Sequence, residues 1–227
     1  PTAVSISFEI PDTLKDAYKF IAGQYVTVKY IFNGNEIRRS YSISSSPKSG
    51  EFRIVVKAIE NGAFSTFATT VLKAGDQLEV GTPEGKFIFE PKENNQHNYC
   101  GIAAGSGITP IISIANSVLE SEPKSSFVLI YGNKSPEFTI FHQAIHDLQQ
   151  KYVGRFFVHY NFTNAHPEGS LFGRIDRATM NFVLKNKHAE KEFEAFYICG
   201  PEEMINLTSE VLKGNNVAEK KIHFELF

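Results

Sequence analysis

From residue 99 onward, short apolar runs alternate with stretches of helical periodicity, and this alternation restricts the possible fold more than any other feature of the sequence. The apolar runs are 99–105 (YCGIAAG), 126–132 (SFVLIYG), 155–162 (RFFVHYNF), 195–200 (AFYICG) and 221–227 (KIHFELF). The helical stretches between them are 108–121, 137–150, 177–186 and 201–213. Continuous apolar runs are typical of parallel strands buried on both faces. The pattern therefore predicts a doubly wound, parallel five-stranded α/β domain whose ligands bind beyond the carboxyl ends of its strands.

The first 91 residues have a different pattern, in which short strands are separated by turn signals such as Asn33-Gly34 and Asn61-Gly62. The predicted strands are 3–10, 24–32, 36–45, 51–59, 77–81 and 86–90, with one short helix at 64–72. Short strands at this spacing favour a small antiparallel six-stranded barrel. The charged and amide-rich stretch 90–98 is interpreted as a linker. We therefore expect a β domain at 1–91 followed by an α/β domain at 92–227.

Composition excludes several classes of protein. The chain has 23 basic and 25 acidic residues, a net charge of −2, so it lacks the basic surface that nucleic acid or an anionic membrane would require. The apolar stretches are all shorter than the roughly 20 residues of a membrane helix. Its two cysteines, Cys100 and Cys199, fit neither a metal-ligand spacing nor a disulfide framework. These features predict a reduced, cytoplasmic globular protein, and the abrupt first and last strands suggest a part of a longer chain.

A glycine loop follows the first apolar run of the second half. In GIAAGSGITP, residues 101–110, Gly105 and Gly107 allow a sharp turn, and the helix after them presents free N–H groups suited to a pyrophosphate. Pro110 stands where the three-glycine dinucleotide fingerprint would have its last glycine, and no P-loop Lys-Ser/Thr pair follows. Cys199-Gly200-Pro201 ends another strand at the same edge. Two such loops favour a dinucleotide, with a ligand-free turn and a buried structural cysteine as the alternatives.

The stretch RRSYSISSSP, residues 38–47, ends a predicted strand with two arginines, a tyrosine and five serines. A barrel wall does not require this mixture. A ligand with phosphates at one end and a flat ring at the other would explain it. The stretch is therefore a second candidate for ligand binding.

Together, RRSYSI, GIAAGSGITPIISI, YGNKS and YICGPEEM follow the order and spacing of the ferredoxin–NADP reductase superfamily, which the chain resembles over essentially its whole length. Within it, the chain is most similar to reductase components of multicomponent oxygenases, above all the phenylacetyl-CoA oxygenase/reductase type of phenylacetate degradation. The resemblance implies FAD in the first domain and NADPH, with NADH as the alternative, in the second. It implies a two-iron two-sulfur ferredoxin domain, C-terminal in the full protein or separate, and an oxygenase component as partners. No Cys-x4-Cys-x2-Cys cluster is present in the sequence.

The resemblance assigns residues of the first domain to FAD. Arg39 would hold the phosphates, Tyr41 would stack on the isoalloxazine, and the Ser42 hydroxyl would hydrogen-bond the flavin N5. The remaining flavin-binding residues that it implies are Ser40, Ile43, Val56, Lys57, Gly62, Phe64 and Ser65. For Ser65, a helix N-cap is the alternative interpretation. The family also has one more strand before the segment that opens this chain, so we expect an incomplete barrel.

In the second domain the resemblance implies a nicotinamide-dinucleotide site. Its residues are Gly105, Ser106, Thr109, Pro110, Cys199, Gly200, Pro201 and Met204. Ser42, Cys199 and Glu225 are the predicted catalytic residues, with a solvent-exposed strand end as the alternative for Glu225. Lys134, Ser135 and Arg174 match positions that bind the 2′-phosphate, which favours NADPH, although a lysine cannot make the bidentate contact of an arginine.

Three other interpretations compete with this one. His142 and His146 lie four apart on a predicted helix, but they are expected on its solvated flank rather than at a metal. A non-catalytic nucleotide-binding module for regulation or assembly is the rival from another class. Within the enzymes, the rival is a flavohaemoprotein-type reductase domain.

Overall fold

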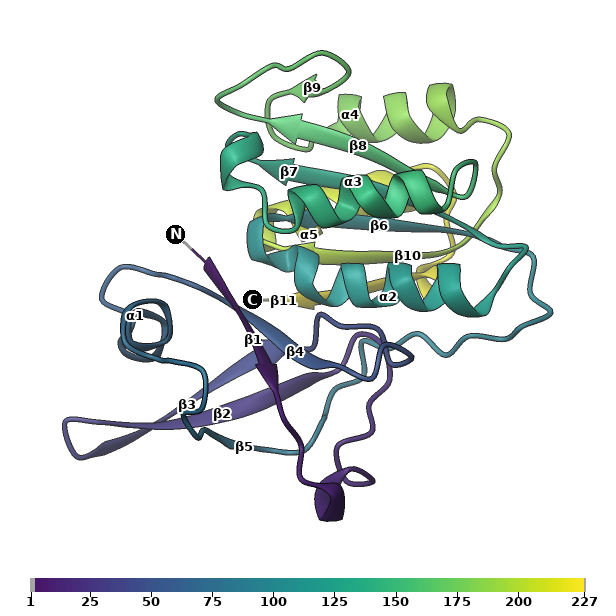
Figure 1. Cartoon of the computed structure of the whole chain (residues 1–227). Helices are drawn as coiled ribbons and strands as arrows, with labels where there is room; N and C mark the ends of the chain where they lie inside the picture. Colours follow the sequence, from purple (N-terminus) through teal and green to yellow (C-terminus); the bar gives the residue numbers. More distant parts are fainter. Residues whose placement is uncertain (1–2, 227) are drawn as a thin grey trace.

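A computed structural model describes residues 3–226, and Figure 1 shows two parts of different architecture. Residues 3–91, here called the first half, form small antiparallel sheets. Residues 92–226, the second half, form one parallel sheet covered by helices on both faces (Figure 1). The predicted combination of a β domain with a doubly wound α/β domain is confirmed. The position of the boundary at 91/92 stays a prediction.

The first half contains five short strands among its described residues. They are β1 Ala3–Phe8, β2 Tyr25–Phe32, β3 Asn35–Ser42, β4 Phe52–Lys57 and β5 Glu79–Val80, with helix α1 Ala63–Thr70 and a 3-10 turn at Asp12–Leu14. One antiparallel sheet has the order β3-β2-β5 and the other pairs β1 with β4. The predicted sixth strand at 86–90 is wrong: only Phe89 makes a bridge there, to Ala22. Phe87 and Phe89 are instead buried among aromatic residues of the second half.

The barrel is open on one side. Among the described residues, β1 pairs only with β4, and β5 pairs only with β2. A cavity of about 1040 Å³ lies between β1 and the segment 72–78. This opening agrees with the expected incomplete barrel, and the further strand of the family stays a prediction.

The second half is a single parallel sheet with the order β11-β10-β6-β7-β8-β9. Its strands are β6 Asn98–Ala104, β7 Ser126–Asn133, β8 Phe156–Phe162, β9 Leu171–Phe172, β10 Phe193–Gly200 and β11 Ile222–Leu226. The five predicted strands are confirmed over their described residues. Strand β9 was not predicted, because two residues are too few to produce a pattern.

Helices cover both faces of this sheet. They are α2 Ile108–Ser121, α3 His142–Lys151, α4 Arg177–Asn181, which a π-helical segment continues at Phe182–Lys187, and α5 Glu202–Gly214. Short 3-10 turns lie at Gly105–Gly107, Pro136–Phe138 and Glu219–Lys221. Helix α3 begins five residues later than predicted, because Phe141 before it has a left-handed backbone (φ 62°). No helix in residues 3–226 is long and apolar enough to cross a membrane.

The interior is continuous between the halves. Helices α2 and α3 pack on one face of the parallel sheet, and α4 and α5 pack on the other. The first of these cores also includes Ala22, Phe87 and Phe89 from the first half. A separate small core lies between the antiparallel sheets and α1. The two halves are therefore joined by shared apolar packing.

Candidate functional site

The carboxyl ends of β6 and β10 lie side by side, and the two predicted ligand loops meet there. Gly105 adopts a left-handed backbone, with φ 54°. Gly107 packs directly on the other loop, because a Cβ at this position would lie 2.1 Å from the Cys199 carbonyl oxygen. Gly200 likewise approaches Ala104 and the Met204 side chain. The glycines are therefore needed for the close contact between the two loops.

Hydrogen bonds fix the shape of the glycine loop. The Thr109 hydroxyl donates to the Ser106 carbonyl at 3.0 Å. The Tyr131 hydroxyl donates to the Gly105 carbonyl at 2.9 Å. With Pro110 buried in its first turn, α2 begins directly at this loop. The arrangement leaves backbone N–H groups at the start of α2 for an anion. Tyr131 was not among the predicted residues, because nothing in the sequence of a buried strand indicates that a hydroxyl reaches the neighbouring loop.

Ser42, at the end of β3, meets Glu225 of β11. The serine hydroxyl donates to the glutamate Oε2 at 3.4 Å, which joins the first half to the last strand of the second. Burial raises the pKa of Glu225 to about 7, and the hydrogen bond from Ser42 opposes that shift. The carboxylate is thus half-buried rather than at a solvent-exposed strand end. Its protonation changes near neutral pH.

Cys199 stands opposite Glu225 in the register of β10 and β11. Its side chain is fully buried, and burial raises the pKa of the thiol, with a further contribution from Glu225. The sulfur is therefore a neutral packing group in this arrangement. Ser42, Glu225 and Cys199 lie close together. Because the Cys199 side chain is buried, a ligand ring could contact only the backbone of this segment and the residues beside it.

Strand β3 carries the residues assigned to flavin binding. The Arg39 guanidinium is exposed and donates to the Arg38 carbonyl at 2.7 Å, and it forms no salt bridge within residues 3–226. The Tyr41 ring is half-buried with its centroid 5.6 Å from that of Phe64, and burial raises its pKa. Ser40 is exposed, with its hydroxyl 3.4 Å from that of Thr27. This edge thus offers a cation, a ring and a hydroxyl to a ligand.

Three other predicted flavin residues point inward. Ile43, Val56 and Phe64 are buried in the small core. Their side chains therefore support the site from beneath, and a ligand can meet only their backbone.

Helix α1 begins differently from the sequence-based alternative. Its N-cap is Gly62, so the interpretation of Ser65 as the N-cap is wrong. The buried Ser65 hydroxyl donates to the Gly62 carbonyl and accepts from the Ile59 N–H, both at 3.3 Å. A Cβ on Gly62 would lie 2.3 Å from the Ser65 Oγ, so this tight turn depends on glycine.

Lys57 brings a cation of the first half to the glycine loop. A Cβ built on Gly105 would lie 3.7 Å from the Lys57 Nζ. Phosphate groups are suited by the donors present here, which are Lys57, Arg39 and the N-termini of α1 and α2. The residues present therefore fit a phosphate-bearing dinucleotide.

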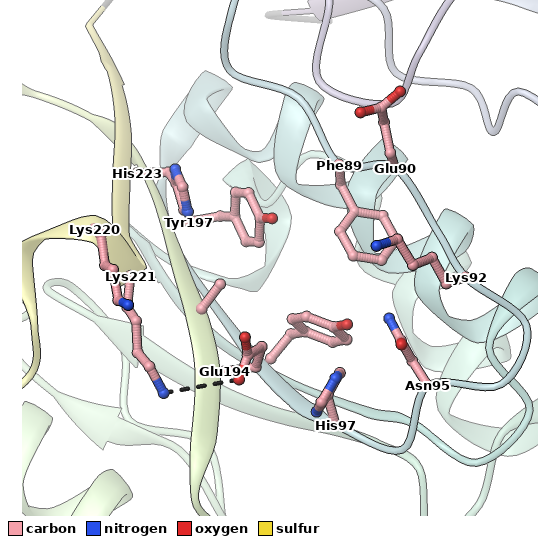
Figure 2. A pocket seen from close by; sticks show the side chains of 12 residues that line it. Phe89, Glu90, Lys92, Asn95, His97, Glu194, Tyr197, Lys220, Lys221 and His223 are labelled. Atoms are coloured by element: carbon pink, nitrogen blue, oxygen red, sulfur yellow. Dashed lines mark ion pairs between the residues drawn. The ribbon is translucent and has the colours of Figure 1, made fainter.

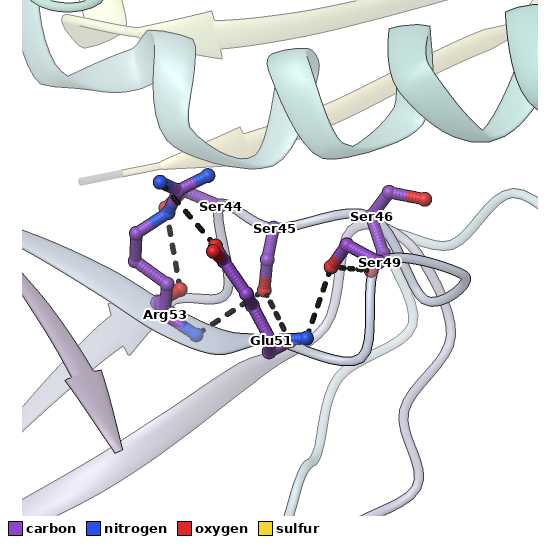
Figure 3. A network of polar contacts seen from close by, with 6 residues as sticks. All are labelled: Ser44, Ser45, Ser46, Ser49, Glu51 and Arg53. Carbon is purple, nitrogen blue, oxygen red and sulfur yellow. Dashed lines mark hydrogen bonds and ion pairs between the residues drawn. The ribbon is translucent and has the colours of Figure 1, made fainter. Parts of the chain in front are cut away.

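Three of the five serines of the motif at 38–47 have another role, shown in Figure 3. Ser44, Ser45 and Ser46 are buried. The Ser44 hydroxyl donates to the Arg53 carbonyl at 3.2 Å, and that of Ser45 donates to the Glu51 carbonyl at 2.9 Å. The hypothesis that the whole motif faces a ligand is wrong for these three residues, since they hold the chain against itself.

The residues assigned to the 2′-phosphate lie at the same edge of the sheet. Lys134 is exposed beyond β7. The Ser135 hydroxyl donates to the Glu137 carboxylate, and this bond lowers the pKa of Glu137. Arg174 lies 3.5 Å from Glu203, with both side chains exposed. Two of the three groups thus already interact with carboxylates.

A cavity of about 490 Å³ lies elsewhere, between the linker and the beginnings of β10 and β11 (Figure 2). Tyr197 and His223 stack there, with ring centroids 5.0 Å apart. None of the predicted site residues lines it. In the described part of the chain, no group of three or more His, Cys, Asp or Glu residues could hold a metal ion.

The fold and the edge described above define a class: a two-part scaffold that presents groups suited to phosphate on each half. Comparison with known proteins agrees. Residues 3–89 match the oxidoreductase FAD-binding domain, and residues 102–210 match the oxidoreductase NAD-binding domain. The chain therefore combines an FAD-binding with an NAD-binding oxidoreductase domain.

Particular relatives are similar over almost the whole chain. It is 39% identical over 226 residues to one of the subunits of 1,2-phenylacetyl-CoA epoxidase from Escherichia coli (strain K12), and the match covers 99% of this chain and 64% of the relative. It is 31% identical to a flavohemoprotein of Oceanobacillus iheyensis, over 96% of this chain and 53% of the relative. The chain thus spans less than two thirds of either protein.

A solved structure has the same fold. The ferredoxin NADP+ reductase from Neisseria gonorrhoeae, determined with bound FAD and NADP, superposes with a TM-score of 0.81 at 20% identity. The match covers 99% of this chain and 92% of that chain.

Proposed function

We propose that this chain is the flavin- and nucleotide-binding part of a reductase that passes electrons from a nicotinamide dinucleotide through FAD to an iron–sulfur centre serving an oxygenase. The observation that carries this proposal is the contact of Ser42 with Glu225 beside the glycine loop. It brings the flavin-binding motif of one half against the nucleotide-binding loops of the other. Bound FAD supplies the chemistry, because it accepts two electrons together and releases them singly.

In the first half, Arg39 and the N-terminus of α1 bind the flavin phosphates, and Tyr41 supports the ring. Ser42 donates a hydrogen bond at the reacting edge. The Glu225 carboxylate, with its pKa near 7, holds or releases a proton beside that hydroxyl.

In the second half, the Gly105–Gly107 loop and the N-terminus of α2 bind the dinucleotide phosphates. Thr109 keeps the loop in shape, and the segment from Cys199 to Pro201, with Met204 beneath it, borders the nicotinamide. Lys57 adds a positive charge from the first half. Both halves must therefore be in place for the site to be complete.

NADPH is the proposed electron donor, with Lys134, Ser135 and Arg174 facing its 2′-phosphate. A specific observation favours NADH as the second candidate. Ser135 donates to Glu137, and Arg174 lies beside Glu203, so two carboxylates stand where an additional phosphate would bind. Like charges at this distance weaken anion binding.

The proposed electron acceptor is a two-iron two-sulfur domain, attached to the C-terminal side or separate, that feeds an oxygenase of the phenylacetyl-CoA type. The similarity to a protein of the phenylacetyl-CoA epoxidase supports this choice. Similarity to flavohemoproteins supports the second candidate, a reductase that feeds a haem domain. A non-catalytic nucleotide-binding module on the same fold is the third.

An absorbance spectrum after addition of FAD and desalting tests the proposal, followed anaerobically by NADPH and then NADH. Retained flavin that NADPH bleaches faster than NADH supports the reductase and the donor together. Faster bleaching by NADH supports the reductase function but makes NADH the electron donor instead of NADPH. Retained flavin that neither nucleotide bleaches supports the non-catalytic module. If no flavin is retained, the test is repeated with a chain extended at its N-terminus by a strand like the one that the family has there.

A variant tests the flavin-binding residues. Tyr41→Ala should weaken flavin binding about tenfold or more, because stacking on an aromatic ring is worth roughly 1–3 kcal/mol. Tyr152→Ala, in the second half, is the matched control and should leave flavin affinity unchanged. Wild-type flavin affinity and bleaching rate in Tyr41→Ala would remove Tyr41 from the site.

A further inference from the structure

Glu122, directly after α2, is a fully buried carboxylate that binds the linker between the halves. Its Oε1 accepts hydrogen bonds from the Lys92 N–H and the Asn95 side-chain amide, both at 2.9 Å. Its Oε2 accepts from the Tyr99 hydroxyl at 3.0 Å and the Ser125 hydroxyl at 2.7 Å. A buried carboxylate is tolerated only when such donors replace water. Four donors from three segments therefore converge on one side chain, and two of them belong to the linker.

The chain that carries Glu122 is itself held in place by Arg155. The guanidinium donates to the Glu122 carbonyl at 2.7 Å and to the Ser125 carbonyl at 2.8 Å. It also donates to the Leu119 carbonyl in the last turn of α2, at 3.3 and 3.2 Å. A cation at this position satisfies carbonyl groups that a helix end leaves without partners. Arg155 thus fixes the position of the backbone at Glu122, and with it the position of the carboxylate that binds the linker.

Helix α2 contacts the first half along its length. In the middle of the helix, the Ser113 hydroxyl donates to the Ser45 carbonyl at 2.7 Å, and near the C-terminal end the Ser46 hydroxyl donates to Glu120. At about 1.5 Å per residue, the 14 residues of α2 span roughly 20 Å. One end carries the glycine loop and the other end lies against Glu122. A displacement of the linker is therefore transmitted to the glycine loop through one rigid element, helix α2.

We propose that Glu122 is a positioning residue: by binding the linker to the end of α2, it sets the orientation of the first half in which Ser42 meets Glu225. This inference rests on the proposed function, because orientation affects turnover only if the two halves hold the two reacting cofactors. Transfer between cofactors depends steeply on their separation, and a displacement of about 1 Å far from the chemistry can cost up to roughly 100-fold in rate. The shared apolar core limits the displacement, so a smaller effect is expected here.

Glu122→Gln tests the proposal, because it keeps the size of the side chain and replaces one acceptor oxygen by an amide donor. We expect the Lys92 amide to exchange hydrogen about tenfold faster or more. Residual dipolar couplings of the ligand-free protein should show a changed angle between the halves. The rate of flavin reduction at saturating nucleotide should fall about three- to tenfold, with KM within about twofold of wild type.

Glu210→Gln is the matched control. Glu210 lies on α5 of the same half, where its exposed carboxylate pairs with Arg177 at 3.0 Å. The same chemical change there should leave amide exchange, the angle and the reduction rate at their wild-type values.

A wild-type angle and reduction rate in Glu122→Gln, despite faster Lys92 exchange, would overturn the proposal and leave Glu122 with a purely stabilising role. If this variant fails to fold, Asn95→Ala removes one linker donor only. It should change the angle and the rate in the same direction by a smaller amount, and wild-type values in it would equally overturn the proposal. Failure of the proposed function is recognised separately, as wild-type protein whose bound flavin neither nucleotide reduces. A changed angle in ligand-free Glu122→Gln would support the positioning role even then.

Discussion

The two halves of the molecule reach stability in different ways. The second half has one uninterrupted six-stranded sheet with a core on each face. The first half has sheets of two and three strands, open on one side, around a core of eight buried residues. Three further buried apolar residues of the first half, Ala22, Phe87 and Phe89, belong to the core of the other half. The difference indicates that the second half is the scaffold and that the first half depends on it.

Polar contacts also cross the seam, the surface along which the two halves touch. The buried Ser45 and Ser46 bind to residues of α2, and the Arg53 guanidinium lies 5.9 Å from the centroid of the Phe141 ring. These groups would lose their partners if the second half were removed. Buried polar groups without partners cost free energy, so the contacts between the halves stabilise both of them. The first half, with the smaller core of its own, depends on these contacts more.

The largest expected effect comes from separating the halves. Residues 92–227 alone should unfold cooperatively on heating, because the sheet and most of both its cores remain. Residues 1–91 alone should show no cooperative transition, because small open sheets are at best marginally stable in water. Circular dichroism melting curves of the two fragments check this. A cooperative transition in 1–91 would show that its own core is sufficient and would break the comparison.

A smaller effect is expected where the scaffold presents its ligand loops. Gly107→Ala places a methyl group within 2.1 Å of the Cys199 carbonyl oxygen, so backbone must move, and the free energy of unfolding should fall by about 2–3 kcal/mol. Gly214→Ala is the control, since nothing lies within 4 Å of a Cβ there. Urea unfolding curves measure both. Equal stability of the two variants would contradict the close packing of the loops.

The two halves also differed in how far their folds could be predicted from the sequence. Buried parallel strands such as β6 and β7 are apolar at almost every position, so their patterns are strong and local. The segment 86–90 has the alternation of a strand, yet Phe87 and Phe89 bury against Tyr197 and Tyr99 instead of pairing. A tertiary contact with a residue such as Tyr197, far along the chain, has no local signal. The first half was therefore predicted in type but not in its last strand.

The site shows the same limit. Motif spacing predicted that the glycine loop and the Cys199 segment share an edge, because carboxyl ends of parallel strands always do. It could not separate Ser42, which faces Glu225, from Ser44 and Ser45, which bind the backbone of their own half. In the sequence, a serine that faces the site looks the same as one that binds backbone. The cluster around Glu122 was missed for another reason, because its donors come from three separate segments of the chain.

The pH dependence of stability that Glu225 causes provides a test of the contact between the halves. Its pKa is about 7 in the folded protein, above the ordinary value of 4.5. The charged form is thus disfavoured on folding, so its contribution to stability is complete below about pH 4.5 and is lost as the pH rises through 7. Relative to Glu225→Gln, which stays neutral, the wild type should lose roughly 1–3 kcal/mol between pH 5 and 8, a range reduced for partial exposure.

Chemical denaturation at several pH values measures this difference. Ser42→Ala should raise the pKa further, because it removes the hydrogen bond that favours the charged form. An NMR titration of the Glu225 carboxyl checks that shift. A stability difference that stays flat from pH 5 to 8 would mean that the seam does not shield this carboxylate.

The smallest expected effect lies wholly within the second half. The Nε2 atoms of His159 and His188 are 2.8 Å apart, so one ring donates to the other and the pair is stable only with at least one neutral ring. Burial lowers the pKa of His159 to about 4, and it also lowers that of His188. Neutral rings are favoured in the folded state, so this stability is present above about pH 6.5 and is lost as the pH falls towards 4.

Between pH 7 and 4.5, His188→Gln should therefore lose about 1–2 kcal/mol less stability than the wild type. His166→Gln, at an exposed loop histidine, controls for the removal of a histidine as such. Because both rings belong to the scaffold, the fragment 92–227 should show the same difference as the whole chain. A difference that appears only in the whole chain would mean that the first half reaches further into the scaffold than its contacts show, and the division between scaffold and dependent half would have to be redrawn.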